Sequence, residues 1–118
     1  MTTEQYSKAI TQLEKALAQP KDEFIRDSVI QRFEFTFELA WKTAKKVLGT
    51  QSVGTKIIIR EMAQQGFIND TNLWFDLLEA RNLSVHTYKE ELAEKVYLIA
   101  KGSVSEFRQL LNKLNEHS

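Results

Sequence analysis

The chain has 118 residues, which suits one ordinary domain and is too short for two, so we expect a single helical domain over residues 1–118. Its 16 basic residues balance its 16 acidic residues, which disfavours both a disordered acidic tail and a strongly basic nucleic-acid clamp. The absence of cysteine excludes a disulfide framework, a thiolate zinc site and a catalytic thiol.

No apolar run approaches the roughly 20 residues of a membrane span, and the N-terminus lacks the charged and apolar regions of a signal peptide. We therefore expect a soluble, cytoplasmic protein that does not enter a membrane. The chain contains only four glycines and one proline. Because a fold of many short strands needs many turns, this scarcity favours long helices.

The first predicted helix covers residues 3–18. Its apolar residues recur at steps of four, three and four from Tyr6 to Leu17, which places them on one helical face. Pro20 ends the helix, and the acidic residues after it suit the start of the next one.

The second predicted helix covers residues 22–48 and has no internal breaker. One apolar stripe runs along it, formed by Ile25, Val29, Phe33, Phe37, Trp41, Ala44 and Leu48. Phe35 and Leu39 lie off this stripe, which indicates a central helix with two neighbours or a helix that also faces another subunit. The strand-like alternation from Phe33 to Phe37 is outweighed by the helical spacing on both sides.

Residues 49–54 form a predicted loop, and a third helix covers residues 55–65 with Gly66 as the residue that follows its end. The run Ile57–Ile59 favours a strand by propensity. A lone strand would have no partner, however, so we assign these residues to the helix.

Asn69–Thr71 offers N-cap candidates for a fourth helix. We expect its inward face to carry Trp74, Leu77, Leu78, Arg81 and Val85. A fifth helix covers residues 89–115, with one side formed by Leu92, Val96, Ile99, Phe107, Leu110 or Leu111, and Leu114. Gly102 and Ser103 interrupt that side, which predicts either a closely approaching neighbour or a bend.

These elements predict an all-α fold, an antiparallel four- to five-helix bundle. The extra apolar face of the second helix favours a homodimer.

The candidate site is the polar segment from Arg81 to Tyr88. Arginine, histidine and tyrosine can together hold a phosphate, move a proton and supply a hydroxyl. On a continuous helix Arg81 and Tyr88 share a face and Asn82 neighbours His86, whereas Arg81 and His86 lie about 140° apart. Those two converge only if the helix ends or bends, if both side chains reach sideways, or if two subunits pool their motifs. A purely structural role in capping and ion pairing is the competing interpretation.

Charge is unevenly distributed along the middle of the chain. Residues 41–60 contain five basic residues and no acidic ones, whereas residues 61–80 contain four acidic residues and no basic ones. The basic block could meet phosphates or an acidic partner, or form an ordinary solvated helix end.

The sequence resembles the HEPN superfamily, and within it the HepT-like "nucleotidyltransferase substrate-binding protein" branch. The resemblance rests on Arg-Phe-Glu-Phe-Thr-Phe-Glu-Leu-Ala-Trp-Lys at 32–42, on Trp74–Leu78, and on Glu79-x-Arg81-Asn82-x3-His86-Thr87-Tyr88. It covers nearly the whole chain. It implies a homodimeric helical bundle with a groove at the dimer interface and a minimal nucleotidyltransferase encoded by a neighbouring gene.

Two functions attach to this family. In one, the protein is a toxin, a metal-independent ribonuclease that the nucleotidyltransferase neutralises by transferring AMP to Tyr88. The resemblance then implies that Arg81 holds the RNA phosphate, His86 moves a proton and Asn82 assists. In the other, the chain is the non-catalytic substrate-binding subunit of a two-component nucleotidyltransferase. Neither function implies an intrinsic cofactor or metal, since ATP and Mg would belong to the partner.

Overall fold

The computed structural model describes residues 3–117, and within them it contains five α-helices and no strand. The helices are α1 (Glu4–Leu17), α2 (Glu23–Leu48), α3 (Thr55–Gln64), α4 (Thr71–Leu83) and α5 (Glu90–Glu116), with a 3₁₀ turn at Ser84–His86. The predicted all-α bundle is confirmed, including the helical state of Ile57–Ile59. Residues 1, 2 and 118 of the predicted domain lie outside the described residues.

The helix ends lie where local side-chain chemistry predicts them. The Asp22 carboxylate accepts a hydrogen bond from the Ile25 amide at 2.7 Å, and Asp70 does the same for Leu73 at 3.0 Å. Gly49 ends α2 with φ of 67°, a left-handed conformation that glycine adopts without steric cost.

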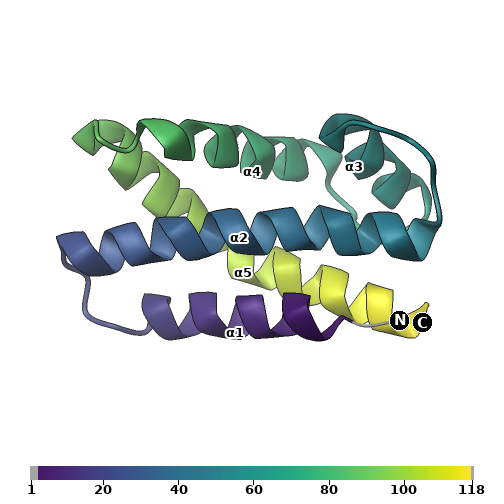
Figure 1. The fold of residues 1–118 in the computed structure, drawn as a ribbon, viewed down its shortest axis with the longest axis horizontal. Helices are drawn as coiled ribbons and strands as arrows, with labels where there is room; N and C mark the ends of the chain where they lie inside the picture. The colour runs from purple at the N-terminus through teal and green to yellow at the C-terminus, as the bar shows by residue number, and fades with distance from the viewer. Residues whose placement is uncertain (1–2, 118) are drawn as a thin grey trace.

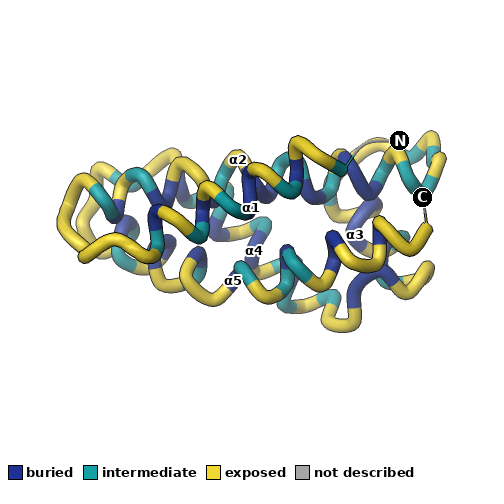
Figure 2. The backbone as a smooth tube through the Cα atoms, turned by 90° about the horizontal axis from the view of Figure 1, so that it is seen from below, coloured by how far each residue is buried: buried dark blue, intermediate teal, exposed yellow. Residues whose placement is uncertain are grey.

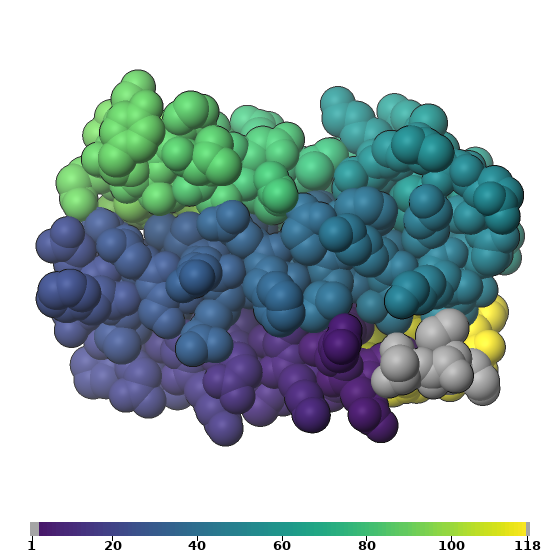
Figure 3. All heavy atoms as spheres, viewed as in Figure 1, coloured from purple at the N-terminus to yellow at the C-terminus, as the bar shows by residue number. Residues whose placement is uncertain are grey.

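The long helix α2 is the centre of the molecule (Figure 1), and it contacts all four other α-helices. α1 packs along one side of it, α3 and α4 lie on the other side, and α5 crosses behind. Buried positions of all the helices point into the space between them (Figure 2). One face of α2 nevertheless stays open to solvent between α1 and α4, as the space-filling view shows (Figure 3).

An aromatic cluster fills the middle of the bundle. The Trp74 ring centroid lies 6.1 Å from that of Phe37 and 5.8 Å from that of Phe107, and all three side chains are fully buried. The Tyr6 hydroxyl donates to the Phe107 carbonyl at 2.7 Å, so the buried phenol of α1 is satisfied by α5. This cluster ties α1, α2, α4 and α5 together.

One sequence-based expectation about packing is wrong, and one of the two alternatives for Gly102, a closely approaching neighbour, is not observed at that residue. Val85 does not lie on an inward face but is 63% exposed, because α4 ends at Leu83 and the chain changes to a 3₁₀ turn. Gly102 is exposed, and a Cβ atom added to it would meet nothing within 4 Å, so no neighbouring helix approaches closely there. The adjacent Ser103 is the buried residue, and its hydroxyl donates to the Ala100 carbonyl at 2.7 Å.

The two ends of the described chain meet. The Thr3 hydroxyl donates to the side-chain oxygen of Asn115 at 2.7 Å. Figure 1 shows both ends at one pole of the bundle, with the turn between α4 and α5 at the opposite pole. None of the described helices is long and apolar enough to cross a membrane.

Candidate functional site

The candidate site is built on the tight connection between α4 and α5. The Ser84 hydroxyl donates to the Arg81 carbonyl at 2.5 Å, and the Thr87 hydroxyl donates to the Ser84 carbonyl at 3.1 Å. The Lys89 amide closes the turn on the His86 carbonyl at 3.1 Å. These local bonds compete with helix continuation, which explains why α4 stops before His86.

His86 and Tyr88 lie side by side on this turn and face solvent. The Tyr88 hydroxyl lies 3.5 Å from His86 Nδ1, at the long limit of a hydrogen bond, and the two rings meet edge to face with centroids 5.9 Å apart. Tyr88 is 76% exposed, so its phenol is open to a reacting partner. The imidazole and the phenol thus form one accessible polar pair.

Arg81 is held from α2 rather than from its own helix. Its Nε donates to Glu38 Oε1 at 2.6 Å, and the two side chains are 33% and 27% exposed. No other hydrogen bond joins the guanidinium of Arg81 to the described residues. Its two terminal amino groups are therefore available to a phosphate, for which the guanidinium fork is well suited.

The structure separates residues that a continuous helix would have aligned. Because α4 ends at Leu83, the helical pairing of Asn82 with His86 and the shared face of Arg81 and Tyr88 are both lost. Asn82 is exposed. Among the described residues of one chain, no hydrogen bond or ion pair links Arg81 to His86. Arg81 and Asn82 therefore lie in the last turn of α4, whereas His86 and Tyr88 lie in the connection that follows it.

Sequence reasoning missed two anchors of this region. Glu38 stands out in the sequence only as part of the 32–42 motif, yet its carboxylate accepts a hydrogen bond from Arg81, which lies 43 positions later in the chain. Arg26, 5% exposed, donates to both carboxylate oxygens of Glu90 at 2.7 and 3.1 Å and so ties α2 to the first turn of α5. This bond, with the nearby positive charge, lowers the pKa of Glu90. A charged residue on the inner side of an apolar helix was the available signal for both.

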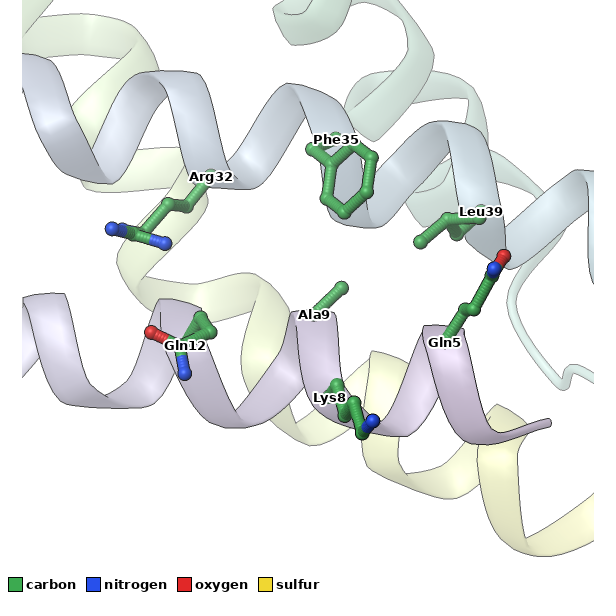
Figure 4. A pocket seen from close by; sticks show the side chains of 7 residues that line it. All are labelled: Gln5, Lys8, Ala9, Gln12, Arg32, Phe35 and Leu39. Carbon is green, nitrogen blue, oxygen red and sulfur yellow. The ribbon is translucent and has the colours of Figure 1, made fainter.

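A second feature of the same face is a surface groove between α1 and α2, with a volume of about 500 Å³. Figure 4 shows Phe35 and Leu39 projecting from α2 and Ala9 and Gln5 facing them from α1. Phe35 is 60% exposed, so the second apolar face predicted for this helix is real and uncovered in the single chain. In contrast, the described residues contain no cluster of His, Cys, Asp and Glu suited to a metal ion.

A family model described as "nucleotidyltransferase substrate binding protein like" matches residues 2–116. The chain belongs to this family. The sequence is 33% identical over 97 residues to a Haemophilus influenzae protein named probable ribonuclease HepT, a match that covers 75% of this chain and 66% of that protein. The chain thus spans slightly less than two thirds of that relative.

Solved structures of family-like proteins share the fold. A Thermus thermophilus protein superposes with a TM-score of 0.86 at 31% identity, covering 92% of this chain and 98% of that one. HI0074 of Haemophilus influenzae superposes with a TM-score of 0.85 at 29% identity, covering 93% and 96%. HI0074 is described as having the fold of a substrate-binding domain of a nucleotidyltransferase. The names of these relatives thus refer to a ribonuclease in one case and to a substrate-binding domain in another.

Proposed function

We propose that the chain is a HepT-like toxin, a metal-independent endoribonuclease that uses Arg81 and His86 and is neutralised by AMP transfer to Tyr88. The observation that carries this proposal is the exposed His86–Tyr88 pair on the turn that follows α4, the helix that carries Arg81 in its last turn. One solvent-facing segment then offers a proton carrier, a phosphate-binding fork and a modifiable phenol. The relative named probable ribonuclease HepT supports it.

The reaction needs only side chains of these kinds. The RNA 2′-oxygen attacks the adjacent phosphorus while the bond from phosphorus to the 5′-oxygen breaks, which leaves a 2′,3′-cyclic phosphate and a 5′-hydroxyl. His86 accepts the 2′-hydroxyl proton or donates one to the leaving oxygen, the acid–base role that histidine serves most often in enzymes. Arg81 stabilises the charge that grows on the phosphoryl oxygens through its two amino groups. Asn82 is an auxiliary hydrogen-bond donor at the edge of the site.

The active unit in this proposal is a homodimer. Within one described subunit no hydrogen bond or ion pair joins His86 to Arg81, and in the proposed dimer the second copy adds its own Arg81 and His86 to the groove. The open face of α2 carries Phe35, which lines the groove against α1 (Figure 4), and Glu38 of the same helix accepts a hydrogen bond from Arg81. In the proposed dimer two such faces pack together and bury Phe35.

Neutralisation requires a second protein, the minimal nucleotidyltransferase, with its own ATP and Mg. The Tyr88 phenolic oxygen forms a bond to the α-phosphorus of ATP, pyrophosphate leaves, and the phenolic proton passes to a base of the partner or to water. The added AMP places a negative charge and a bulky base within reach of His86, which lies 3.5 Å from the acceptor oxygen. RNA is then excluded by occupancy and by charge.

A second candidate function is the non-catalytic substrate-binding subunit of a two-component nucleotidyltransferase. It is favoured by the description of HI0074. In this case Arg81 and His86 form a docking or ligand site, the chain alone cleaves no RNA, and activity arises only in the complex.

The decisive experiment measures RNA cleavage and intact mass together. The chain alone should leave 2′,3′-cyclic phosphate ends on RNA, and Arg81→Ala and His86→Ala should abolish this, whereas His117→Ala, at the opposite pole, should not. Co-expression with the nucleotidyltransferase should add one AMP or a small multiple, and this gain should be lost in Tyr88→Phe. An unmodified, inactive chain in a stable complex would favour the substrate-binding subunit.

A further inference from the structure

The basic block of the sequence folds into a second site on the same face as the proposed catalytic residues. A surface pocket of about 590 Å³ lies where the C-terminal part of α2 meets the loop after Gly49. Its lining includes Lys42, Lys45 and Lys46 beside the Trp41 ring and Thr50. No acidic residue of the described chain lines it, so we call this the lysine pocket.

The charges around the lysine pocket are only partly compensated. Lys42 Nζ lies 3.9 Å from Glu38 Oε2, a loose contact with a 59% exposed lysine. Glu61 lies near Lys45, and its pKa is lowered by hydrogen bonds from Ser52 and Thr50 and, to a smaller extent, by the Lys45 charge. Lys46 has no ion-pair partner among the described residues. The pocket therefore presents net positive charge although the chain as a whole is neutral.

An ion-pair chain connects this pocket to the proposed phosphate site. Glu38 accepts from Arg81 through Oε1 and faces Lys42 through Oε2, so these three side chains follow one another across the surface of α2. A polyanion that contacts Arg81 passes the Glu38 carboxylate before it reaches Lys42, so its phosphates would contact Arg81 and Lys42 on either side of that carboxylate. The Trp41 ring is half-buried against the core but lines the pocket, so its open part offers a stacking surface, with Lys42 Nζ 5.7 Å from the ring centroid.

We infer that the lysine pocket is an auxiliary binding site for single-stranded RNA, which holds backbone phosphates and one base beyond the nucleotide that contacts Arg81. Lysines bind phosphates as point charges, and an aromatic ring accepts any base by stacking. This combination suits RNA better than an acidic protein segment, which would use the lysines and leave the ring without a role. The inference rests on the proposed function, because that function places RNA at Arg81 and so sets the course of the strand from the lysine pocket toward Arg81.

The test measures the salt dependence of RNA binding by Lys42→Gln/Lys45→Gln/Lys46→Gln. The probe is a 2′-O-methyl RNA oligonucleotide, in which the nucleophile is blocked so that binding is observed without cleavage. Each phosphate contact on a single strand adds about 0.7 to the slope of log affinity against log salt. Three contacts add about 2, so between about 50 and 200 mM salt the unaltered chain should lose roughly twentyfold more affinity than the variant.

The matched control is Lys15→Gln/Lys95→Gln/Lys101→Gln, which removes the same charge from exposed lysines of α1 and α5. We expect it to bind like the unaltered chain. Equal losses in the two triple variants would overturn the inference, because net charge alone would then explain the effect. Thermal melts of both variants report whether either is less folded.

Fluorescence gives a second readout. Trp41 and Trp74 are the only tryptophans, and Trp74 is fully buried, so quenching by bound RNA reports on Trp41. Quenching by the oligonucleotide but not by inorganic polyphosphate is expected. If the lysine variant no longer binds the nucleotidyltransferase but still binds RNA as the unaltered chain does, the inference is overturned. The lysines would then form a contact surface for an acidic protein. RNA binding through these lysines in a chain that cleaves nothing would instead contradict the proposed ribonuclease and leave the pocket standing.

Discussion

Glu38 should act as a positioning residue for Arg81, and Glu38→Ala tests this directly. The carboxylate fixes the guanidinium through one 2.6 Å bond to Nε and leaves the two amino groups directed elsewhere. Without it Arg81 gains rotational freedom and must be ordered by the substrate itself. We expect kcat/KM for RNA cleavage to fall about tenfold, which corresponds to about 1.4 kcal/mol of transition-state stabilisation. Glu38→Gln keeps an acceptor oxygen and should recover most of the activity.

The stability cost of the same substitution follows from the exposure of the pair. Hydrogen bonds to charged groups contribute about 1.5–3 kcal/mol and exposed ion pairs about 0.2–1 kcal/mol. With side chains 33% and 27% exposed, the Arg81–Glu38 pair falls between them at about 1 kcal/mol. This should lower Tm by about 4 °C for a domain of this size.

A matched ion pair elsewhere separates positioning from stability. Arg108 bonds to Glu14 at 2.5 Å, with side chains 36% and 40% exposed, and lies between α1 and α5. Glu14→Ala should lower Tm by a similar amount and leave RNA cleavage unchanged. If Glu38→Ala and Glu14→Ala lower Tm equally and neither loses RNA cleavage, Glu38 does not position Arg81. If Arg81→Ala is inactive in the same assay, the catalytic role of Arg81 still stands.

Three further predictions concern assembly, acid stability and the core. Phe35→Asp should convert the proposed dimer into a folded monomer in sedimentation experiments, since the ring is 60% exposed in one chain; an unchanged mass would place the interface elsewhere. Because Arg26 lowers the pKa of Glu90 in the folded state, the pair stabilises the protein above the unfolded value of about 4.3 and this contribution is lost as pH falls through the lowered value. Urea midpoints at neutral and acid pH should differ less in Glu90→Gln. Trp74→Ala should cost about 3–5 kcal/mol in chemical unfolding, because the ring is fully buried; a cost below about 1 kcal/mol would contradict the described core.

The helices could be predicted from the sequence because their ends depend on local chemistry. The carboxylates of Asp22 and Asp70 accept hydrogen bonds from backbone amides three residues later, and Gly49 ends α2 in a left-handed backbone conformation. Neither kind of signal depends on tertiary structure. The same reasoning failed at Val85, where serine and threonine side chains bond nearby carbonyls and stop α4 early. The apolar residues keep a helical spacing as far as Val85, but the backbone there forms a 3₁₀ turn held by these local hydrogen bonds.

The sequence alone singles out the residue types of the candidate site, but not the contacts that these residues make in the structure. Arg81, His86 and Tyr88 stand out because few other residues of the chain combine these chemistries. The Arg81–Glu38 bond joins residues 43 positions apart, and its existence depends on how α4 packs against α2. No spacing rule within one helix contains that information. The gathering of lysines beside Trp41 likewise needs the path of the chain after Gly49.

The contact between Thr3 and Asn115 has a practical consequence for handling the molecule. Because the two ends of the described chain lie together, a short linker should join them, and new termini could be opened in the loop between α2 and α3. Such a circular permutant would keep every helix pair while changing the order in which the helices leave the ribosome. Reporters fused near the ends of the described chain would stand at the pole away from Tyr88, but beside the lysine pocket, which Gln5 and Gly49 also line (Figure 1).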